Sequence, residues 1–178
     1  MTRSELEHVI RAAGAIADDR EIVIIGSQSV LGQFPQAPTA LLASMEADVF
    51  PRNRPERANL IDGAIGEGSH FHEQFGYYAQ GVGETTATLP KGWRKRLVRV
   101  KNENTGDIAG LCLEVHDLAI SKYVAGREKD LAYTTTLARQ GMTSRQTLLK
   151  RAAQIKLAPA LRKLVEGRIG RDFAPKRR

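Results

Sequence analysis

The chain has 178 residues, of which 42% are apolar and 26% are charged. A chain of this length buries roughly 70% of the surface that its unfolded form exposes, so neither disulfides nor a structural metal is required for folding. Its single cysteine, Cys112, excludes an internal disulfide and predicts a buried thiol in a reducing compartment. No apolar run approaches the length of a membrane span, and the polar start MTRSELEH does not resemble a signal peptide. These features predict a cytoplasmic protein with no membrane partner.

The net charge of +7 is concentrated in two segments. Residues 161–178 hold seven Lys or Arg against Glu166 and Asp172, a local balance of +5. A second basic cluster, KGWRKRLVRVK, surrounds Trp93. Such clusters are typical of proteins that bind polyanions, because each neutralised phosphate releases counterions. A solvated basic face with a frayed tail is the alternative interpretation.

Hydrophobic patterns along the first part of the chain predict a mixed sheet. Ser4 and Glu7 have the spacing of a capping box, and the apolar residues after them predict a helix to about Ala17. Short β-branched or alternating runs, bounded by Gly and Pro, predict strands. The predicted strands are 21–25, 45–50, 75–83, 97–101 and 110–115, with helices over 53–65 and from Ser69 onward.

Residues after His116 have only helical patterns. The predicted helices are 117–125, 128–140, 143–154 and 159–168. We therefore expect an α+β fold, in which a mixed β-sheet flanked by helices is followed by a C-terminal helical region. The predicted division is a core of residues 1–115 and a helical region of residues 116–178, which packs on the core and ends in a basic tail.

Two acids on one predicted strand are the first candidates for chemistry. Glu46 and Asp48 are two residues apart, so both carboxylates point to the same face. Carboxylates this close repel each other, and Mg²⁺ relieves the repulsion while taking its remaining ligands from phosphates and water. Gly26 and Ser27 end an earlier strand, and Ser27 is expected to cap a short helix whose free N–H groups favour a phosphate. If the two strands are neighbours, metal and triphosphate meet in one cleft; otherwise these are ordinary strand ends with solvated acids.

A predicted helix pair, HDLAISKYVAGREKDLAY, adds a third element. It contains Lys122, Arg127, Lys129 and Asp130. A basic side chain beside a metal cleft holds a triphosphate and offsets the charge that develops on leaving pyrophosphate. A salt-bridged, solvated helix face is the structural alternative.

The order of these motifs resembles the minimal nucleotidyltransferases of the DNA polymerase β superfamily. The resemblance is closest to the AbiEii-type group, from which bacterial toxin–antitoxin nucleotidyltransferases come, and it covers roughly residues 22–137. It implies a nucleotidyltransferase-like sheet, a Mg²⁺ or Mn²⁺ cofactor and an NTP as substrate.

The resemblance also implies roles for the residues of the sheet. Gly26 and Ser27 match the turn that holds the nucleotide phosphates. Glu46 and Asp48 match the paired catalytic carboxylates that bind the metal, although Glu46 replaces the more usual Asp.

For the helix pair, the resemblance implies contacts with the triphosphate. Lys122 matches a catalytic lysine that binds the nucleotide, and Asp130 matches the catalytic acid of the "KD" motif. Arg127 lies within the same motif and is implied as a further nucleotide contact.

The chain departs from the family pattern at a third carboxylate, which many polymerase-like enzymes carry on a later strand to activate the attacking hydroxyl. On the candidate strands, Gln80 and Arg99 stand at positions from which a side chain could point toward the site, and Glu84 and Glu114 lie nearby in the sequence. Asp130 is the alternative base.

Two functions follow as hypotheses. The first is a Mg²⁺-dependent enzyme that transfers a nucleotidyl group from an NTP to a hydroxyl acceptor. The basic balance points to RNA, the resemblance favours tRNA, and a protein or small-molecule hydroxyl is the alternative acceptor. The protein would then be the toxin of a toxin–antitoxin pair, with a cognate antitoxin as partner. The second hypothesis is a catalytically degenerate member of the fold that binds nucleotide, RNA or a partner protein.

Overall fold

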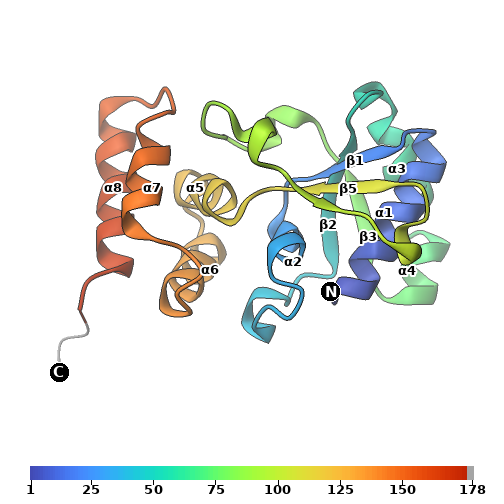
Figure 1. Cartoon of the computed structure of the whole chain (residues 1–178), viewed down its shortest axis with the longest axis horizontal. Helices are drawn as coiled ribbons and strands as arrows, with labels where there is room; N and C mark the ends of the chain where they lie inside the picture. The colour runs from blue at the N-terminus through green and yellow to red at the C-terminus, as the bar shows by residue number, and fades with distance from the viewer. Residues whose placement is uncertain (176–178) are drawn as a thin grey trace. The chain divides into compact units, whose positions relative to one another are not determined.

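The computed structural model describes residues 1–175 and contains a five-stranded mixed sheet. The strand order is β3-β2-β1-β5-β4 (Figure 1). Antiparallel pairs join β1 to β2 and β4 to β5, and parallel pairs join β1 to β5 and β2 to β3. This sheet with its flanking helices confirms the predicted α+β class. The strands are β1 (Glu21–Ile24), β2 (Glu46–Pro51), β3 (Tyr78–Gly81), β4 (Val98–Val100) and β5 (Ala109–Cys112).

The chain divides into two compact units. Unit 1 comprises residues 1–86 and 96–114 and carries the sheet with helices α1 (Arg3–Ala17), α2 (Val30–Gln33), α3 (Ala58–Ile65) and α4 (His70–Phe75). Unit 2 comprises residues 87–95 and 115–178 and carries α5 (Val115–Ala125), α6 (Glu128–Arg139), α7 (Arg145–Ala152) and α8 (Pro159–Asp172). The segment 87–95 groups with the helical unit, which its sequence does not indicate. The predicted division at residue 115, with the helical region packed on the core, stays a prediction.

One face of the sheet is covered by helices of unit 1. Strand β1 is central, and its side chains Ile22, Val23 and Ile24 are at most 2% exposed. Helix α1 packs its apolar stripe on this face so closely that a Cβ on Gly110 of β5 would lie 2.4 Å from Ile10. Helices α2 and α3 contact α1 and the same face. Each buried aliphatic side chain contributes about 1.5–3 kcal/mol of transfer free energy, so this layer fixes the sheet.

Cys112 lies in this layer and confirms the predicted buried thiol. A Cβ on Gly32 of α2 would lie 2.4 Å from the Cβ of Cys112, so helix and strand are in close contact there. Burial raises the pKa of the Cys112 thiol to about 12, which makes it unreactive at neutral pH.

The ends of several elements differ from the sequence prediction. The N-cap of α1 is Thr2 rather than Ser4, because Thr2 and Glu5 form the reciprocal capping box two residues earlier. Helix α1 ends at Ala17 as predicted. The predicted strand 75–83 is shorter, because Phe75 ends α4 and Gly76 follows in the left-handed conformation at φ 74°.

The starts of two other helices differ in their capping. Asn53 does not cap the helix before Ile65; instead it donates a hydrogen bond to Asp19, and a 3₁₀ turn over Pro55–Arg57 precedes α3 without a side-chain cap. At α7 the N-cap is Ser144 rather than its neighbour Thr143, and the Ser144 hydroxyl accepts from Thr147 N–H.

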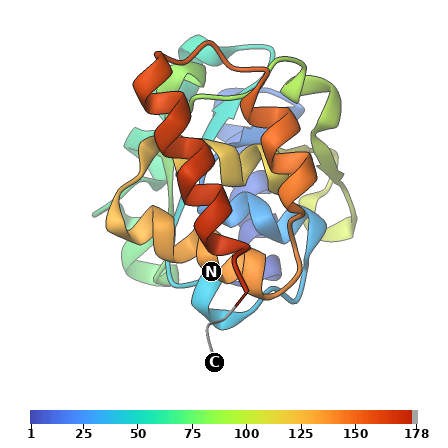
Figure 2. The ribbon, with the colours of Figure 1, turned by 90° about the vertical axis from the view of Figure 1, so that its left-hand side faces the viewer.

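Unit 2 is a group of helices in which α8 packs against α5, α6 and α7 (Figure 2). Val165 and Ile169 of α8 are fully buried. At the end of α8, Asp172 accepts hydrogen bonds from the hydroxyls of Tyr123 (2.8 Å), Thr134 (3.1 Å) and Thr135 (2.7 Å). Burial and the charge of Asp172 raise the pKa of Tyr123, which keeps this phenol protonated. The end of α8 is therefore bonded to both α5 and α6.

None of the helices between residues 1 and 175 is both long and apolar enough to cross a membrane. The last three residues of the predicted basic tail lie outside the described residues.

Candidate active site

The two acids of β2 share one face of the sheet, as their spacing predicts. Ala47 and Val49 are fully buried on the helix-covered face, whereas Glu46 and Asp48 alternate with them and are partly exposed. Strands β1 and β2 are neighbours, with Ile24 paired to Val49. This register brings the start of β2 alongside the end of β1, so the two acids lie beside the Gly26-Ser27 turn.

Gly26 and Asp48 are in direct contact. The N–H of Ile25 donates to the carbonyl of Asp48 at 3.0 Å, which holds the two backbones together. A Cβ built on Gly26 would lie 1.9 Å from Oδ2 of Asp48, so the carboxylate occupies the space that any side chain at position 26 would fill. Gly26 itself is extended at φ −80°, a conformation open to any residue, so the requirement for glycine comes from Asp48.

The turn after Gly26 differs in detail from the prediction. Ser27 does not cap a helix; it begins a 3₁₀ turn over Ser27–Ser29, which leads directly into α2. The turn has no side-chain cap bond, and its closing bond runs from Ser29 N–H to Gly26 O at 3.0 Å.

Gln28 is a residue of this turn that sequence reasoning missed. It is fully buried, and its Nε2 donates to the carbonyl of Ser44 at 3.0 Å. The hydroxyl of Ser44 in turn accepts from Glu46 N–H at 3.1 Å. Gln28 therefore ties the turn to the start of the acidic strand. A buried amide between two serines gives no periodic signal, so only the structure identifies this role.

Strand β3 lies on the other side of β2 and places two neutral side chains opposite the acids. Tyr78 pairs with Glu46, and Gln80 pairs with Asp48. The ring centroid of Tyr78 lies 4.6 Å from that of His72. Burial and the charges of Glu46 and other nearby acids raise the pKa of Tyr78, so the site carries a negative field.

Tyr77 has a different environment from its neighbour. Its ring lies in a cluster with His8, Phe71 and Phe75, and its hydroxyl is 2.8 Å from Nδ1 of His8. Tyr77 therefore packs in this aromatic cluster, and of the two tyrosines it is Tyr78 that lies opposite an acid of β2.

The residues present fit a divalent cation. Two carboxylates lie on one face, and the Asp48 carboxylate has room there because position 26 is glycine. They supply the hard oxygen ligands that Mg²⁺ or Mn²⁺ prefers. Within residues 1–175, no group of three or more His, Cys, Asp or Glu side chains is placed to hold a metal. The cation would therefore take its remaining ligands from phosphate and water.

In unit 2, Lys122, Arg127 and Asp130 come together around the break between α5 and α6. Gly126 follows the end of α5 in the left-handed conformation at φ 66°. The chain turns there, so that Asp130 of α6 faces α5. Nζ of Lys122 lies 3.3 Å from Oδ1 of Asp130, and Nε of Arg127 lies 2.6 Å from Oδ2. The motif thus forms a compact ion cluster and not an exposed row of i, i+4 pairs.

Asp130 is the buried centre of this cluster. Its side chain is 1% exposed, and burial alone would raise its pKa. The hydrogen bond from Arg127 and the charge of Lys122 outweigh burial and hold the pKa of Asp130 below its ordinary value. Asp130 is accordingly ionised at neutral pH and oriented toward the two cations.

Comparison with known proteins gives one family. A family model described as a nucleotidyltransferase of unknown function (DUF6036) matches residues 4–156, which include both strands and both helices of the predicted site. Neither a curated protein nor a solved structure matches the chain.

Proposed function

Because the chain belongs to this family of nucleotidyltransferases, we propose that it transfers a nucleotidyl group from an NTP to a hydroxyl acceptor with Mg²⁺ or Mn²⁺. The observation that carries the proposal is the contact between the Asp48 carboxylate and Gly26. It joins the acids that suit a cation to a turn that suits a phosphate, within one unit of the fold.

In this proposal Glu46 and Asp48 hold the cation, which neutralises charge on the triphosphate when bound. Gly26 and Ser27 cradle the β- and γ-phosphates with their backbone. The acceptor oxygen bonds to the α-phosphorus, the bond from that phosphorus to the bridging oxygen breaks, and pyrophosphate leaves.

For the ion cluster of unit 2, the proposal follows the resemblance alone. It assigns Lys122 to the departing pyrophosphate and Arg127 to a second nucleotide contact. The lowered pKa of Asp130 favours a positioning role for this residue, since an ionised carboxylate shared by two cations is a weak base. We therefore assign Asp130 to holding Lys122 and Arg127 in place.

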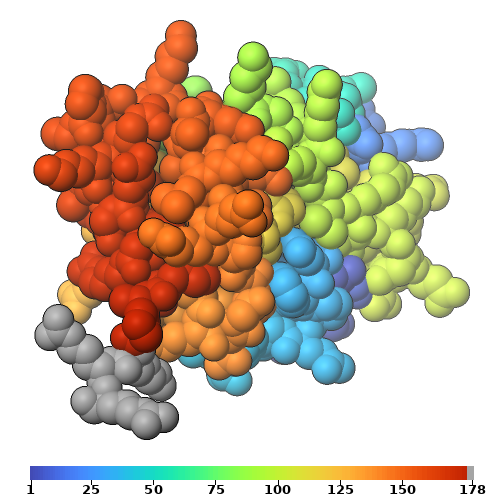
Figure 3. Space-filling model, turned by 60° about the vertical axis from the view of Figure 1, so that its left-hand side comes forward, coloured from blue at the N-terminus to red at the C-terminus, as the bar shows by residue number. Residues whose placement is uncertain are grey.

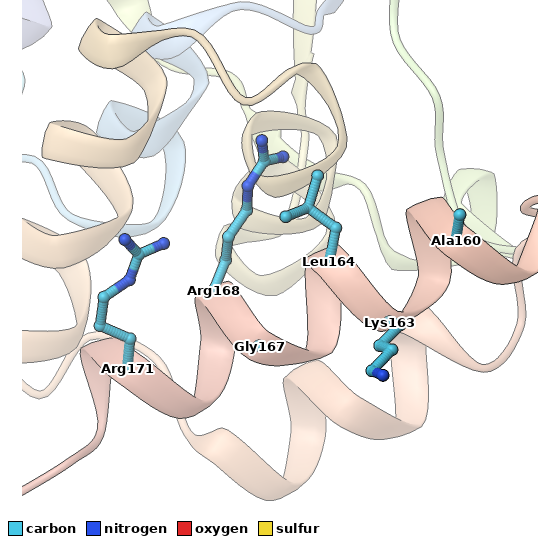
Figure 4. Close-up of a pocket in the computed structure, with 6 residues that line it drawn as sticks. All are labelled: Ala160, Lys163, Leu164, Gly167, Arg168 and Arg171. Atoms are coloured by element: carbon cyan, nitrogen blue, oxygen red, sulfur yellow. The ribbon is translucent and has the colours of Figure 1, made fainter.

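RNA is the acceptor that the charge distribution favours, and tRNA is the specific proposal that follows from the resemblance. An open pocket on α8 is lined by three cations, two small residues and a half-exposed leucine (Figure 4), and α8, in red, lies at the surface in Figure 3. These are Ala160, Lys163, Leu164, Gly167, Arg168 and Arg171. The lining contains no acid, which suits phosphate groups.

Reversing two charges of this pocket should weaken RNA binding. Lys163→Glu with Arg171→Glu is expected to lower affinity for bulk tRNA about tenfold or more and to reduce the slope of log K against log salt by about 1.5, because each lost phosphate contact removes roughly 0.7–0.9. Arg168 is left unchanged, since it donates to the Tyr123 carbonyl at 2.6 Å. The exposed cations Arg20 and Arg139, changed to Glu together, give a control of equal net charge. Equal losses in both variants would contradict a specific role for α8.

Replacing Gly26 tests the contact that carries the proposal. Gly26→Ala should weaken binding of Mn²⁺ with a non-hydrolysable NTP analogue at least about tenfold, because the new methyl group displaces the Asp48 carboxylate. The same change in an Asp48→Ala background should cost less, since the carboxylate at 1.9 Å is gone and only the Cβ of residue 48, at 3.0 Å, remains close. Gly63→Ala is the control, because a Cβ there meets nothing within 4 Å. Equal costs in both backgrounds would disprove the link between Gly26 and Asp48.

The function itself is tested by label transfer. The protein is incubated with each α-labelled NTP, Mg²⁺ and total RNA, and labelled RNA is expected with at least one nucleotide. Binding of nucleotide without incorporation from any of the four would favour the degenerate, non-catalytic alternative. A toxin role with a cognate antitoxin is compatible with either outcome and would require growth inhibition that a co-expressed partner relieves.

A further inference from the structure

Strand β3 lies beside the strand that carries the two acids. Its register with β2 places Gln80 directly opposite Asp48 and Tyr78 directly opposite Glu46. Side chains at paired positions of neighbouring strands point to the same face, and the strands lie about 4.8 Å apart. Positions 78 and 80 are therefore the places on β3 from which a third ligand would reach the two acids.

Both positions hold neutral side chains. Tyr78 offers a phenol, which is not a carboxylate, opposite Glu46. Gln80 is exposed and offers an amide. Glu84 and Glu114, the other acids near the predicted strands, do not complete a group of three within residues 1–175.

Two-cation sites place their ions about 3.5–4 Å apart and share carboxylates between them. Two carboxylates that repel each other are enough to bind one cation, which completes its coordination shell with phosphates and water. From this ligand set we propose that the protein works with a single divalent cation per nucleotide, and that Gln80 occupies the position where a third carboxylate would admit a second. This inference rests on the proposed function.

A single cation changes how the acceptor is activated. The cation that Glu46 and Asp48 would hold serves the triphosphate, so the acceptor hydroxyl would reach the α-phosphorus without a metal of its own. Its proton then passes to water as the new P–O bond forms and pyrophosphate departs. Tyr78 and Gln80 stand opposite the two acids, where a third acid would lie, and their side chains leave the second ion site unbuilt.

The test counts bound ions. Protein saturated with a non-hydrolysable NTP analogue is dialysed against Mn²⁺, and bound Mn²⁺ per bound nucleotide is measured by electron paramagnetic resonance. We expect one for the wild-type chain and two for Gln80→Asp, because the new carboxylate lies beside Asp48. Gln80→Asn, which has the shape of Asp without its charge, should remain at one.

Each other outcome overturns the inference in a distinguishable way. Two Mn²⁺ in the wild-type chain would show that another group completes a second site, while leaving nucleotidyl transfer intact. One Mn²⁺ in Gln80→Asp would show that position 80 is not the third-ligand position. Failure of the wild-type chain to retain nucleotide with Mn²⁺ would remove the proposed function together with this inference.

Discussion

Replacing Glu46 with Gln and Asp48 with Asn should lower nucleotidyl transfer at least about 100-fold and leave the folded chain intact. The amides keep the shape of both side chains but remove the two charges that would hold the cation. Because the acids lie on one face with a negative field around them, their neutralisation should leave the free energy of unfolding unchanged or slightly higher. Transfer is measured with labelled NTP and RNA, and stability by urea unfolding.

A matched variant separates site charge from total charge. Glu56→Gln with Asp62→Asn removes two exposed acids of unit 1 and gives the same change in net charge. This variant should transfer at the wild-type rate. If the Glu46 and Asp48 variant also kept its activity, the assignment of the metal ligands would be wrong.

Asp130→Ala should be the most destabilising of the proposed changes. It removes the shared partner of two cations, and Lys122 is only 13% exposed, so water solvates its charge poorly once the Asp130 carboxylate is gone. Breaking a buried pair in this way costs about 3–5 kcal/mol. Arg127 is 61% exposed, so water can solvate its guanidinium when Asp130 is removed, and it contributes less than Lys122 to the lost free energy of unfolding.

A second variant tests the cause of that loss. Lys122→Met with Asp130→Ala removes both charges and should recover more than half of the stability that Asp130→Ala loses, whereas a packing defect would persist. Urea unfolding of the three chains gives the comparison. No recovery in the double variant would mean that Asp130 stabilises the fold by contacts other than its ion pairs.

The same pair predicts a pH dependence of stability. The pKa of Asp130 is lowered in the folded chain, so the folded state favours the ionised form more than the unfolded state does. The contribution of Asp130 is therefore complete above its unfolded value, near 3.8, and is lost as the pH falls through the lower folded value. Between pH 7 and pH 5, stability should change little from this residue, and Asp130→Ala should flatten the loss below pH 4.

Much of the site could be predicted because its signals are local. The alternation of Glu46 and Asp48 with apolar residues fixes their common face, and the β-branched run before Gly26 fixes a buried strand ending there. The motif of Lys122 and Asp130 likewise lies within one short helix pair. Each of these features depends on residues a few positions apart, which a sequence displays directly.

The remaining features depend on contacts between distant residues. The closeness of Gly26 and Asp48 follows from strand pairing, and the position of Gln80 opposite Asp48 follows from the register of a strand that the sequence predicted too long. The buried role of Gln28 depends on Ser44, sixteen residues away. The caps of α1 and α7 could not be chosen from spacing alone. Thr2 and Ser144 each stand within two residues of another polar residue that can also cap a helix.

The bonds at the end of α8 connect a part of the chain inside the family match to a part outside it. Helix α8 begins at Pro159, beyond the segment that matches the family, whereas Tyr123 and Thr134 lie inside it. Through Asp172, however, α8 is bonded to the helix that carries Lys122 and to the helix that carries Asp130. A substitution at Asp172 would therefore act on both helices of the ion cluster from a position that the family model does not cover.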